Sequence, residues 1–283
     1  MVTAPPTVER ALAAATAVLA GVGMPEPRRE ALRLFSDVLE QPVAGVLSDR
    51  GRDLDPDLAA RLDRLVRRRA AGEPLAYVTG LAGFRNLVLR SDRRALIPRP
   101  ETEGLVDRVL AVGSGGTVVD VGTGTGCIAL ALASEGRFDR VAGIDRSADA
   151  LALAAVNRRR TGIGIQLLRG DLVGAIGSRR VDVVVSNPPY LSQAEYLAVA
   201  GSVRDYEPVL ALSSGPNGLD ATRLLAQDAG RVVVPGGWLM IEIAADRPSE
   251  SAAQVAEAGW SEIRIEADLF GRPRYLMARW RKS

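Results

Sequence analysis

The 283-residue chain contains no histidine and one cysteine, Cys127. The lack of histidine excludes a Ser-His-Asp triad, a histidine general base and a metal site ligated by histidine. A zinc site built from cysteine and histidine is excluded as well, and so is an internal disulfide, which fits a reducing compartment. We therefore expect no metal site, and any chemistry must come from carboxylates, amides, hydroxyls or a bound cofactor.

The chain also lacks a strong charge bias and a long apolar run. Its formal net charge of +2 is too small to indicate nucleic-acid binding, which usually needs a concentrated basic stripe. The uncharged stretch from Ala11 to Met24 is too short to span a membrane, and Glu9 and Arg10 before it do not form the basic leader of a signal peptide. We expect a cytoplasmic protein that binds neither membranes nor nucleic acid directly.

Helical periodicity extends from the amino terminus to about Leu81. Apolar residues recur at helical spacing after Val8, a second helix is predicted over 27–39, and a third begins at Asp55-Pro56, an N-cap followed by proline at N1. The third helix ends in the run Arg67–Arg69, which is either a solvated last turn or a contact for ribosomal RNA or an acidic partner. We predict a helical domain over residues 1–82 that takes part in substrate choice.

The segment after this domain predicts a linker. Residues 84–89 and 94–97 flank Ser91-Asp92, so we expect a β-hairpin linker over residues 83–98. In the stretch from Ile97 to Glu103, two prolines around Arg99 make a rigid strut, after which Glu101 or Thr102 can begin a helix. On its residues alone this stretch indicates a domain junction and no more.

From Thr117 onward, strands alternate with helices, which predicts a mostly parallel α/β sheet over residues 99–283. The last two strands are expected to form an antiparallel hairpin, and a helix is expected over 219–234. The predicted strands are residues 117–121, one ending at Ile144-Asp145, 165–169, 181–185, 238–243, 261–266 and 274–278.

The first of these strands ends in a glycine-rich loop that indicates a cofactor site. Its glycines are spaced G-x-G-x-G, and Cys127 occupies the position of the third glycine in the G-x-G-x-x-G loop of NAD enzymes. A cofactor with a ribose but no pyrophosphate fits this spacing better, so we predict S-adenosylmethionine. Its expected ligands are Asp120 for the ammonium group, Gly122, Thr123, Gly124, Thr125 and Gly126 of the loop, and Asp145 for the ribose hydroxyls.

Two further positions complete the predicted cofactor site. Asp171 is expected to bind the adenine amino group and Leu172 to pack on its ring, although an ordinary turn explains these residues equally well. Asn187 is expected beside the cofactor, because it stands two residues after the end of the strand 181–185.

The tetrapeptide Asn187-Pro188-Pro189-Tyr190 predicts the catalytic and substrate-binding site. The Asn187 side chain and the Pro188 carbonyl offer rigid acceptors, and Tyr190 offers a flat aromatic face. Such a turn suits a planar amino group, as in adenine, cytosine, guanine or the glutamine side chain; a plain loop is the alternative. We predict that Asn187, Pro188 and Tyr190 act in catalysis and that all four residues bind substrate.

Several segments together give the chain a family resemblance. They are Glu73–Tyr77, Ile97–Glu103, Gly122–Gly126, Asn187–Tyr190, Tyr206–Pro208, Asn217–Asp220 and Pro235–Gly237. In this order they resemble the HemK/PrmC family of protein-(glutamine-N5) methyltransferases. Two segments depart from the family pattern: after the expected strand 238–243 the family has a Glu-x-Gly segment with a glutamine nearby, where this chain has Glu242-Ile243-Ala244-Ala245-Asp246, and Asn217 replaces an aspartate.

The resemblance implies a Rossmann-like class I methyltransferase fold, with a seven-stranded sheet behind a helical amino-terminal domain. It also implies that the partner is a class 1 peptide chain release factor and that the glutamine of its Gly-Gly-Gln loop is methylated. Two alternatives stay open from the residues: a methyltransferase acting on the amino groups of nucleic-acid bases, which would need a flipped base and a basic channel, and a non-catalytic protein that binds S-adenosylmethionine.

Overall fold

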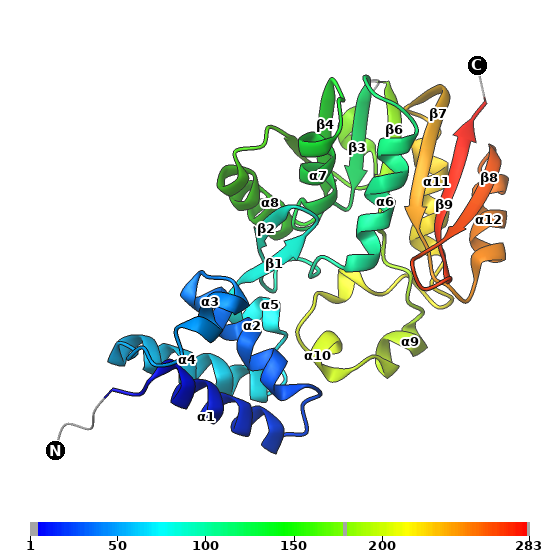
Figure 1. Ribbon diagram of the computed structural model, residues 1–283. Helices are drawn as coiled ribbons and strands as arrows, with labels where there is room; N and C mark the ends of the chain where they lie inside the picture. Colours follow the sequence, from blue (N-terminus) through cyan, green and yellow to red (C-terminus); the bar gives the residue numbers. More distant parts are fainter. Residues whose placement is uncertain (1–4, 178–179, 282–283) are drawn as a thin grey trace. The chain divides into compact units, whose positions relative to one another are not determined.

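The computed structural model describes residues 5–177 and 180–281, which fall into two compact units. The first unit holds residues 1–81 together with 201–206, and the second holds residues 82–200 and 207–283 (Figure 1). The short segment 201–206 joins the first unit although it lies far along the chain, which no local pattern indicates. That residues 83–98 act as a linker stays a prediction.

The first unit is helical, as predicted. Its helices are α1 (Val8–Gly21), α2 (Pro27–Leu39), α3 (Val43–Ser48), α4 (Pro56–Ala70), α5 (Leu75–Thr79) and α10 (Gly201–Arg204). Asp55 caps α4 by accepting hydrogen bonds from the backbone N–H groups of Asp57 and Leu58. The apolar stripe of α1 that begins at Val8 is buried, so helical spacing identifies the core of this unit correctly.

The arginine run at the end of α4 makes internal contacts that neither expected explanation includes. Arg68 donates hydrogen bonds to the Glu73 carboxylate and to the carbonyl of Tyr77, and Arg69 donates to Glu30 of α2 at 2.5 Å. Only Arg67 behaves as a solvated end of a helix, paired with an acid one turn before it. The last turn of α4 therefore ties α2, α4 and α5 together, and this is its first role.

The second unit is built on a seven-stranded sheet with the order β5-β4-β3-β6-β7-β9-β8. Its strands are β3 (Thr117–Val121), β4 (Arg140–Asp145), β5 (Gln166–Arg169), β6 (Val181–Ser186), β7 (Val233–Glu242), β8 (Trp260–Ala267) and β9 (Pro273–Trp280). β9 is antiparallel to both neighbours, and the pairs from β5 to β7 are parallel. The expected fold and its antiparallel final hairpin are confirmed.

Helices cover both faces of this sheet. α6 (Pro100–Ala111) and α7 (Cys127–Glu135) pack against the face that includes Val118, and α11 (Asp220–Ala229) and α12 (Pro248–Glu257) pack against the face that includes Val119. Successive strand residues thus enter opposite cores, as the strand period of two requires. Figure 1 shows α6 in front of the sheet and α11 behind it. The remaining elements are α8 (Ala148–Thr161), α9 (Gln193–Ala198) and the 3₁₀ turns η1 (Gly174–Ile176) and η2 (Val209–Ala211).

The predicted positions of the β-hairpin and of the helix over 219–234 are wrong. The hairpin strands are β1 (Leu81–Phe84) and β2 (Leu87–Arg90), so the chain turns at Arg85 and not at Ser91-Asp92. Arg85 takes a left-handed φ of 51° and its guanidinium binds Glu135 and Asp107, contacts that a local pattern cannot show. α11 spans Asp220–Ala229 and β7 already begins at Val233, so the predicted helix is too long and the predicted strand 238–243 begins too late.

Within residues 5–177 and 180–281, the helices are all too short or too polar to cross a membrane.

The Arg85 cluster should contribute measurably to stability. Its side chain is only 16% exposed, and its hydrogen bonds to Glu135 measure 2.7 and 2.8 Å. We expect Arg85→Met to lower the free energy of unfolding by about 2 kcal/mol, because charged hydrogen bonds are lost and acids are left unpaired. Urea unfolding measures this change. In the matched control Arg231→Met, which removes a side chain that is 75% exposed, the change should stay below about 0.5 kcal/mol.

Candidate active site

The carboxyl ends of four parallel strands bring the predicted site residues to one edge of the sheet. Val121 of β3 pairs with Ile144 of β4, and Asp145 pairs with Arg169 of β5. On the other side, β3 pairs with β6, and the Ser186 hydroxyl donates a 2.7 Å hydrogen bond to the Val121 carbonyl. The loops that follow these strands therefore leave the sheet at the same level.

A cavity of about 270 Å³ opens at this edge. Its volume lies near the lower end of the ~300–1,000 Å³ that small-molecule sites span. Of the predicted residues, Asp120, Gly126 and Tyr190 do not line it. Those that do are Gly122, Thr123, Gly124, Thr125, Asp145, Asp171, Leu172, Asn187, Pro188 and Pro189.

The glycine loop wraps around the carboxylate of Asp145. Gly124 donates its backbone N–H to one oxygen of Asp145 and Ser147 donates to the other, each at 2.9 Å. Gly122 and Gly124 have φ values of 72° and 56°, which side chains rarely adopt, and no atom lies within 4 Å of a Cβ built on Gly122. The loop therefore presents bare backbone to the cavity, with Asp145 fixed at its wall.

Asp120 is fully buried directly behind this loop. One of its oxygens accepts a 2.6 Å hydrogen bond from the Thr123 hydroxyl, and the other makes no hydrogen bond of normal geometry within the described part of the chain. Burial raises the pKa of Asp120 to about 7, and the Thr123 hydroxyl and the Ala129 backbone N–H lower it by less. A buried acceptor without a donor favours a cationic partner at this position.

The cavity wall formed after β5 is more open. Asp171 is exposed, and Leu172 adopts a left-handed φ of 48°, an unfavourable conformation for a branched side chain. Cys127 also lines the cavity, where burial raises the pKa of its thiol to about 12. The thiol therefore stays protonated and is a poor nucleophile, in line with a packing role.

The side chain of Asn187 takes part in a hydrogen-bonded chain that sequence reasoning missed. Its Nδ2 donates to Thr102 Oγ1 at 2.9 Å, and Thr102 Oγ1 donates to Glu242 Oε2 at 2.7 Å. Thr102 lies in the first turn of α6 and Glu242 ends β7, and both are buried. Residues from three separated segments thus hold one carboxamide at the cavity wall.

The segment from Ile97 to Glu103 is part of this site, so its interpretation as a domain junction alone is wrong. Ile97, Arg99 and Thr102 line the cavity. The buried carboxylate of Glu207 accepts from the Ile97 backbone N–H at 3.1 Å and pairs with the Arg99 guanidinium. Glu207 is 110 residues away from Ile97 in the sequence. Only the family resemblance, which includes Tyr206–Pro208, pointed to Glu207.

Asn157 of α8 joins the hairpin to the glycine loop. It is fully buried, its Nδ2 donates to the carbonyls of Thr125 and Arg90, and its Oδ1 accepts from the Arg90 backbone N–H at 2.7 Å. This arrangement satisfies backbone groups of two segments at once and fixes the loop against α8. No motif in the sequence indicates it.

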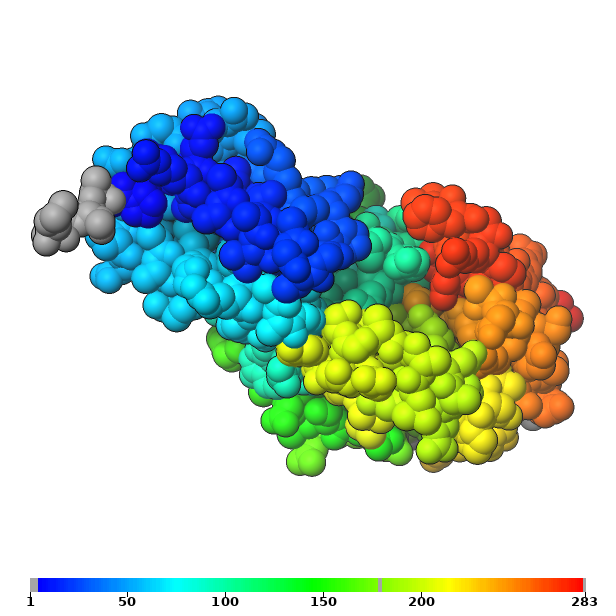
Figure 2. Space-filling model, turned by 90° about the horizontal axis from the view of Figure 1, so that it is seen from below, coloured from blue at the N-terminus to red at the C-terminus, as the bar shows by residue number. Residues whose placement is uncertain are grey.

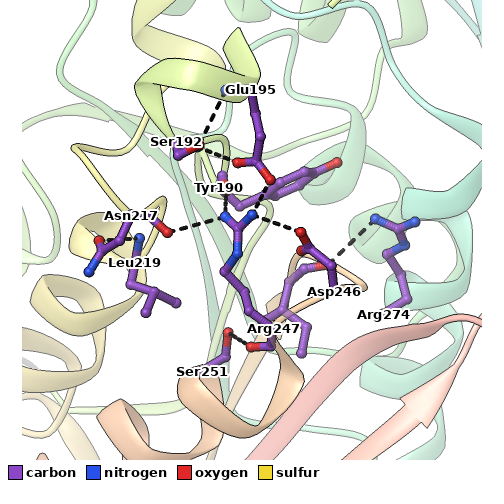
Figure 3. Close-up of polar contacts among 10 residues, drawn as sticks. Tyr190, Ser192, Glu195, Asn217, Leu219, Asp246, Arg247, Ser251 and Arg274 are labelled. Carbon is purple, nitrogen blue, oxygen red and sulfur yellow. Dashed lines mark hydrogen bonds and ion pairs between the residues drawn. The ribbon is translucent and has the colours of Figure 1, made fainter. Parts of the chain in front are cut away.

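Arg247 holds the turn that follows Asn187 (Figure 3). Its guanidinium donates to the carbonyls of Tyr190 and Asn217 at 3.1 and 3.2 Å, and it pairs with Glu195 and Asp246. Burial opposes ionisation of Glu195, but hydrogen bonds from Arg247 and Ser192 lower its pKa to about 2. One cation thus joins the tetrapeptide to α9, to the loop before α11 and to the start of α12.

Close packing around this guanidinium explains a glycine in the sequence. Gly218 has a φ of 77°, and a Cβ at this position would overlap both the Tyr190 carbonyl oxygen and the Arg247 guanidinium. In the space-filling view, yellow-green atoms lie next to orange ones (Figure 2). The turn is therefore enclosed by packing as well as by charge.

Removal of the Arg247 guanidinium should loosen this turn. We expect Arg247→Met to increase amide hydrogen exchange in residues 190–199 and to lower the free energy of unfolding by about 1–2 kcal/mol, since Glu195 is partly screened by solvent. Exchange followed by mass spectrometry measures the local effect. The control Arg223→Met removes a longer, exposed 3.7 Å ion pair in the same unit and should leave exchange at the turn unchanged. Equal exchange in both variants would show that Arg247 does not hold this turn.

Comparisons with known proteins agree with this geometry. Residues 10–80 match the family model described as the PrmC N-terminal domain, and residues 101–203 match the methyltransferase small domain. Among solved structures, a methyltransferase from Pyrococcus furiosus aligns with a TM-score of 0.55 at 16% identity, over 79% of this chain and 100% of that one. A 16S rRNA methyltransferase of T. thermophilus, solved with AdoMet and guanosine, aligns with a TM-score of 0.53 at 17% identity, over 71% of this chain and 50% of that one. At these identities the two structures show the fold alone.

Relatives with a curated description match over nearly the whole length. The release factor glutamine methyltransferase of Cereibacter sphaeroides is 40% identical over 95% of this chain and 97% of its own. Those of Deinococcus radiodurans and Streptomyces coelicolor are 38% and 39% identical, each over 95% of this chain and 96% of its own. At 38–40% identity over nearly the whole length of each protein, the chain belongs to the family of release factor glutamine methyltransferases.

Proposed function

We propose that the protein transfers a methyl group from S-adenosylmethionine to the side-chain amide nitrogen N5 of the glutamine in the Gly-Gly-Gln motif of class 1 peptide chain release factors. The observation that carries the proposal is the carboxamide of Asn187, held at the wall of the cofactor cavity by Thr102 and Glu242. The names of the full-length relatives supply the substrate. The release factor is the partner, and the single cysteine suits the reducing cytoplasm in which such a substrate is found.

The residues around the cavity fit S-adenosylmethionine. The negative charge of Asp120, buried behind the glycine loop and outside the cavity lining, would attract the ammonium group of the cofactor. Asp145 keeps lone pairs for ribose hydroxyls, and the bare backbone at Gly122 and Gly124 allows a close approach. Asp171 and Leu172 line the part of the cavity that would take the adenine. When bound, the cofactor supplies a methyl group attached to a positively charged sulfur.

Asn187 and Pro188 would orient the substrate amide. The glutamine nitrogen carries two N–H groups, and the Asn187 side-chain oxygen and the Pro188 carbonyl can accept one each. Because the nitrogen lone pair is delocalised into the substrate carbonyl, the amide is a weak nucleophile, and its orientation matters more than its basicity. Holding a nucleophile in a reactive geometry can supply roughly 7–11 kcal/mol of the barrier.

No histidine is available to remove a proton, and the proposal needs none. As the new N–C bond forms, the nitrogen becomes positively charged, and one of its N–H protons is then acidic enough to leave to solvent. The acceptors on Asn187 and Pro188 draw electron density toward the nitrogen and so favour this change. Tyr190 would stack on the flat amide; burial and the nearby Glu242 charge raise the pKa of its hydroxyl to about 12, so it stays neutral.

Methyl transfer to a purified release factor tests the substrate. We expect label from S-adenosylmethionine to appear in the release factor, and its Gly-Gly-Gln peptide to gain the mass of one methyl group. A release factor with that glutamine replaced should gain none. Unmethylated DNA and ribosomal RNA are offered separately, and label found only in nucleic acid would overturn the protein substrate while leaving the fold unchanged.

Two substitutions should separate catalysis from cofactor binding. Asn187→Ala removes a substrate acceptor, so kcat should fall by about 100-fold or more while cofactor affinity stays within about threefold. Asp145→Asn weakens a charged contact to the ribose, so cofactor affinity should fall by about tenfold. Turnover kinetics and calorimetric titration with S-adenosylmethionine measure the two effects. Unchanged turnover in the first variant, or unchanged affinity in the second, would contradict the corresponding role.

A further inference from the structure

The carboxamide of Asn187 can serve the reaction in only one of its two orientations. Its oxygen accepts a hydrogen bond from a substrate N–H, whereas its NH₂ group would meet that N–H donor to donor. A rotation of 180° about the last side-chain bond exchanges the two groups with almost no change in shape. Something in the site must therefore select the orientation that presents the oxygen.

The Thr102 hydroxyl selects this orientation because it has only one proton to donate. An ionised Glu242 can only accept, so the Thr102 hydroxyl donates its single proton to Glu242 at 2.7 Å. The Thr102 oxygen can then only accept from Asn187, so the group that faces it at 2.9 Å must be the Nδ2 amide. Oδ1 is thereby left for another donor, and no residue in the described part of the chain provides one to it.

Burial makes the selection strict. Thr102 is 2% exposed and Glu242 is 1% exposed, so water is not a ready substitute for either partner. A buried hydrogen bond to a charged group is stronger than one between neutral groups, and leaving a buried carboxylate without a donor is costly. Reversal of the Asn187 amide would place Oδ1 against the Thr102 oxygen and break the chain of donors.

The charges around Glu242 permit both of its ionisation states. Burial raises the pKa of Glu242 to about 7, Thr102 and Arg274 oppose this rise, Glu101 adds to it, and Arg99 opposes it. The hydroxyls of Tyr190 and Tyr275 also lie within the field of this carboxylate. Glu242 therefore changes charge near neutrality and faces two cations, one acid and two phenols.

We propose that Thr102 and Glu242 are positioning residues that lock the Asn187 carboxamide with its oxygen toward the substrate. The inference rests on the proposed function for the amide that Asn187 receives. The lock joins α6, β7 and the turn after β6, across sequence separations of 85 and 140 residues. It gives Thr102 of the Ile97–Glu103 segment a function that depends on its hydroxyl and not on its place at a helix start.

A matched pair of substitutions at Thr102 tests the lock. Thr102→Val keeps the shape and removes the hydroxyl, so kcat should fall by about tenfold or more while the cofactor dissociation constant stays within about twofold. Thr102→Ser keeps the hydroxyl and should retain activity within about threefold of wild type. The proposal is overturned if the valine variant keeps full kcat, or if the serine variant loses as much as the valine variant.

A spectroscopic measurement without substrate separates the lock from a general loss of structure. The chain has four asparagines, so selective ¹⁵N labelling gives four side-chain amide pairs, and the pair missing from Asn187→Asp identifies Asn187. We expect the Asn187 pair to shift in Thr102→Val and to stay in place in Thr102→Ser, with the other three pairs unmoved in both. An unmoved Asn187 pair in Thr102→Val would overturn the proposal.

The pH dependence provides an independent test of Glu242. At saturating cofactor, kcat of the wild type should rise with pH through about 7. The reason is that ionised Glu242 can only accept the Thr102 proton, whereas the protonated acid can also donate to Thr102. In Glu242→Gln the step should vanish and kcat should stay near the low-pH level of the wild type. Persistence of the same step in this variant would show that another group titrates and would overturn the role of Glu242.

These results distinguish the lock from the proposed function. If wild-type protein fails to methylate a release factor, the substrate is wrong, but the labelled Asn187 amide still reports whether Thr102 fixes its orientation. If wild-type turnover is normal and the Thr102 variants behave alike in both measurements, the function stands and the lock is wrong.

Discussion

The buried carboxylate of Glu242 needs a hydrogen-bond donor, and the residues that supply and position this donor come from other segments of the chain. At the end of β7 it is 1% exposed and needs a donor, which Thr102 supplies from the first turn of α6. The segment just before α6 is held by Glu207, which accepts from the Ile97 backbone N–H and pairs with Arg99. Asn187 then hydrogen-bonds to the Thr102 oxygen. The orientation of the Asn187 amide, which we propose to bind the substrate, thus follows from the hydrogen bond that the buried Glu242 carboxylate requires.

This arrangement suits an enzyme that has no histidine. The amide nitrogen it is proposed to methylate needs no strong base before the transfer, but it needs acceptors in fixed places. An acceptor stays in a fixed orientation when each neighbouring donor already has its own partner. Buried side chains with a complete set of hydrogen bonds meet this condition better than exposed ones. The short chain from Asn187 to Glu242, and the Arg247 guanidinium on the Tyr190 carbonyl, both have this character.

How much of the molecule the sequence predicts depends on how far apart the interacting residues are. The strands β3 and β6 and the glycine loop follow from neighbours in the chain, through apolar runs and glycine spacing, and the structure places them as expected. The hairpin turn at Arg85 and the role of Thr102 depend on partners 50 and 140 residues away, respectively. Local preference gives no information about such pairs, because their energy arises only once the sheet has assembled.

The segment after β7 shows how such distant contacts can change the meaning of a departure from a family pattern. When the sequence is considered alone, Glu242-Ile243-Ala244-Ala245-Asp246 departs from the family's Glu-x-Gly segment with a glutamine nearby. In the structure, Glu242 still closes the hydrogen-bonded chain to Asn187, and Asp246 pairs with Arg247, whose guanidinium donates to the Tyr190 carbonyl. The altered residues therefore carry the chain from one support of the tetrapeptide to the other. The segment therefore connects two groups that hold the tetrapeptide, so a change in it acts first on how firmly this turn is held.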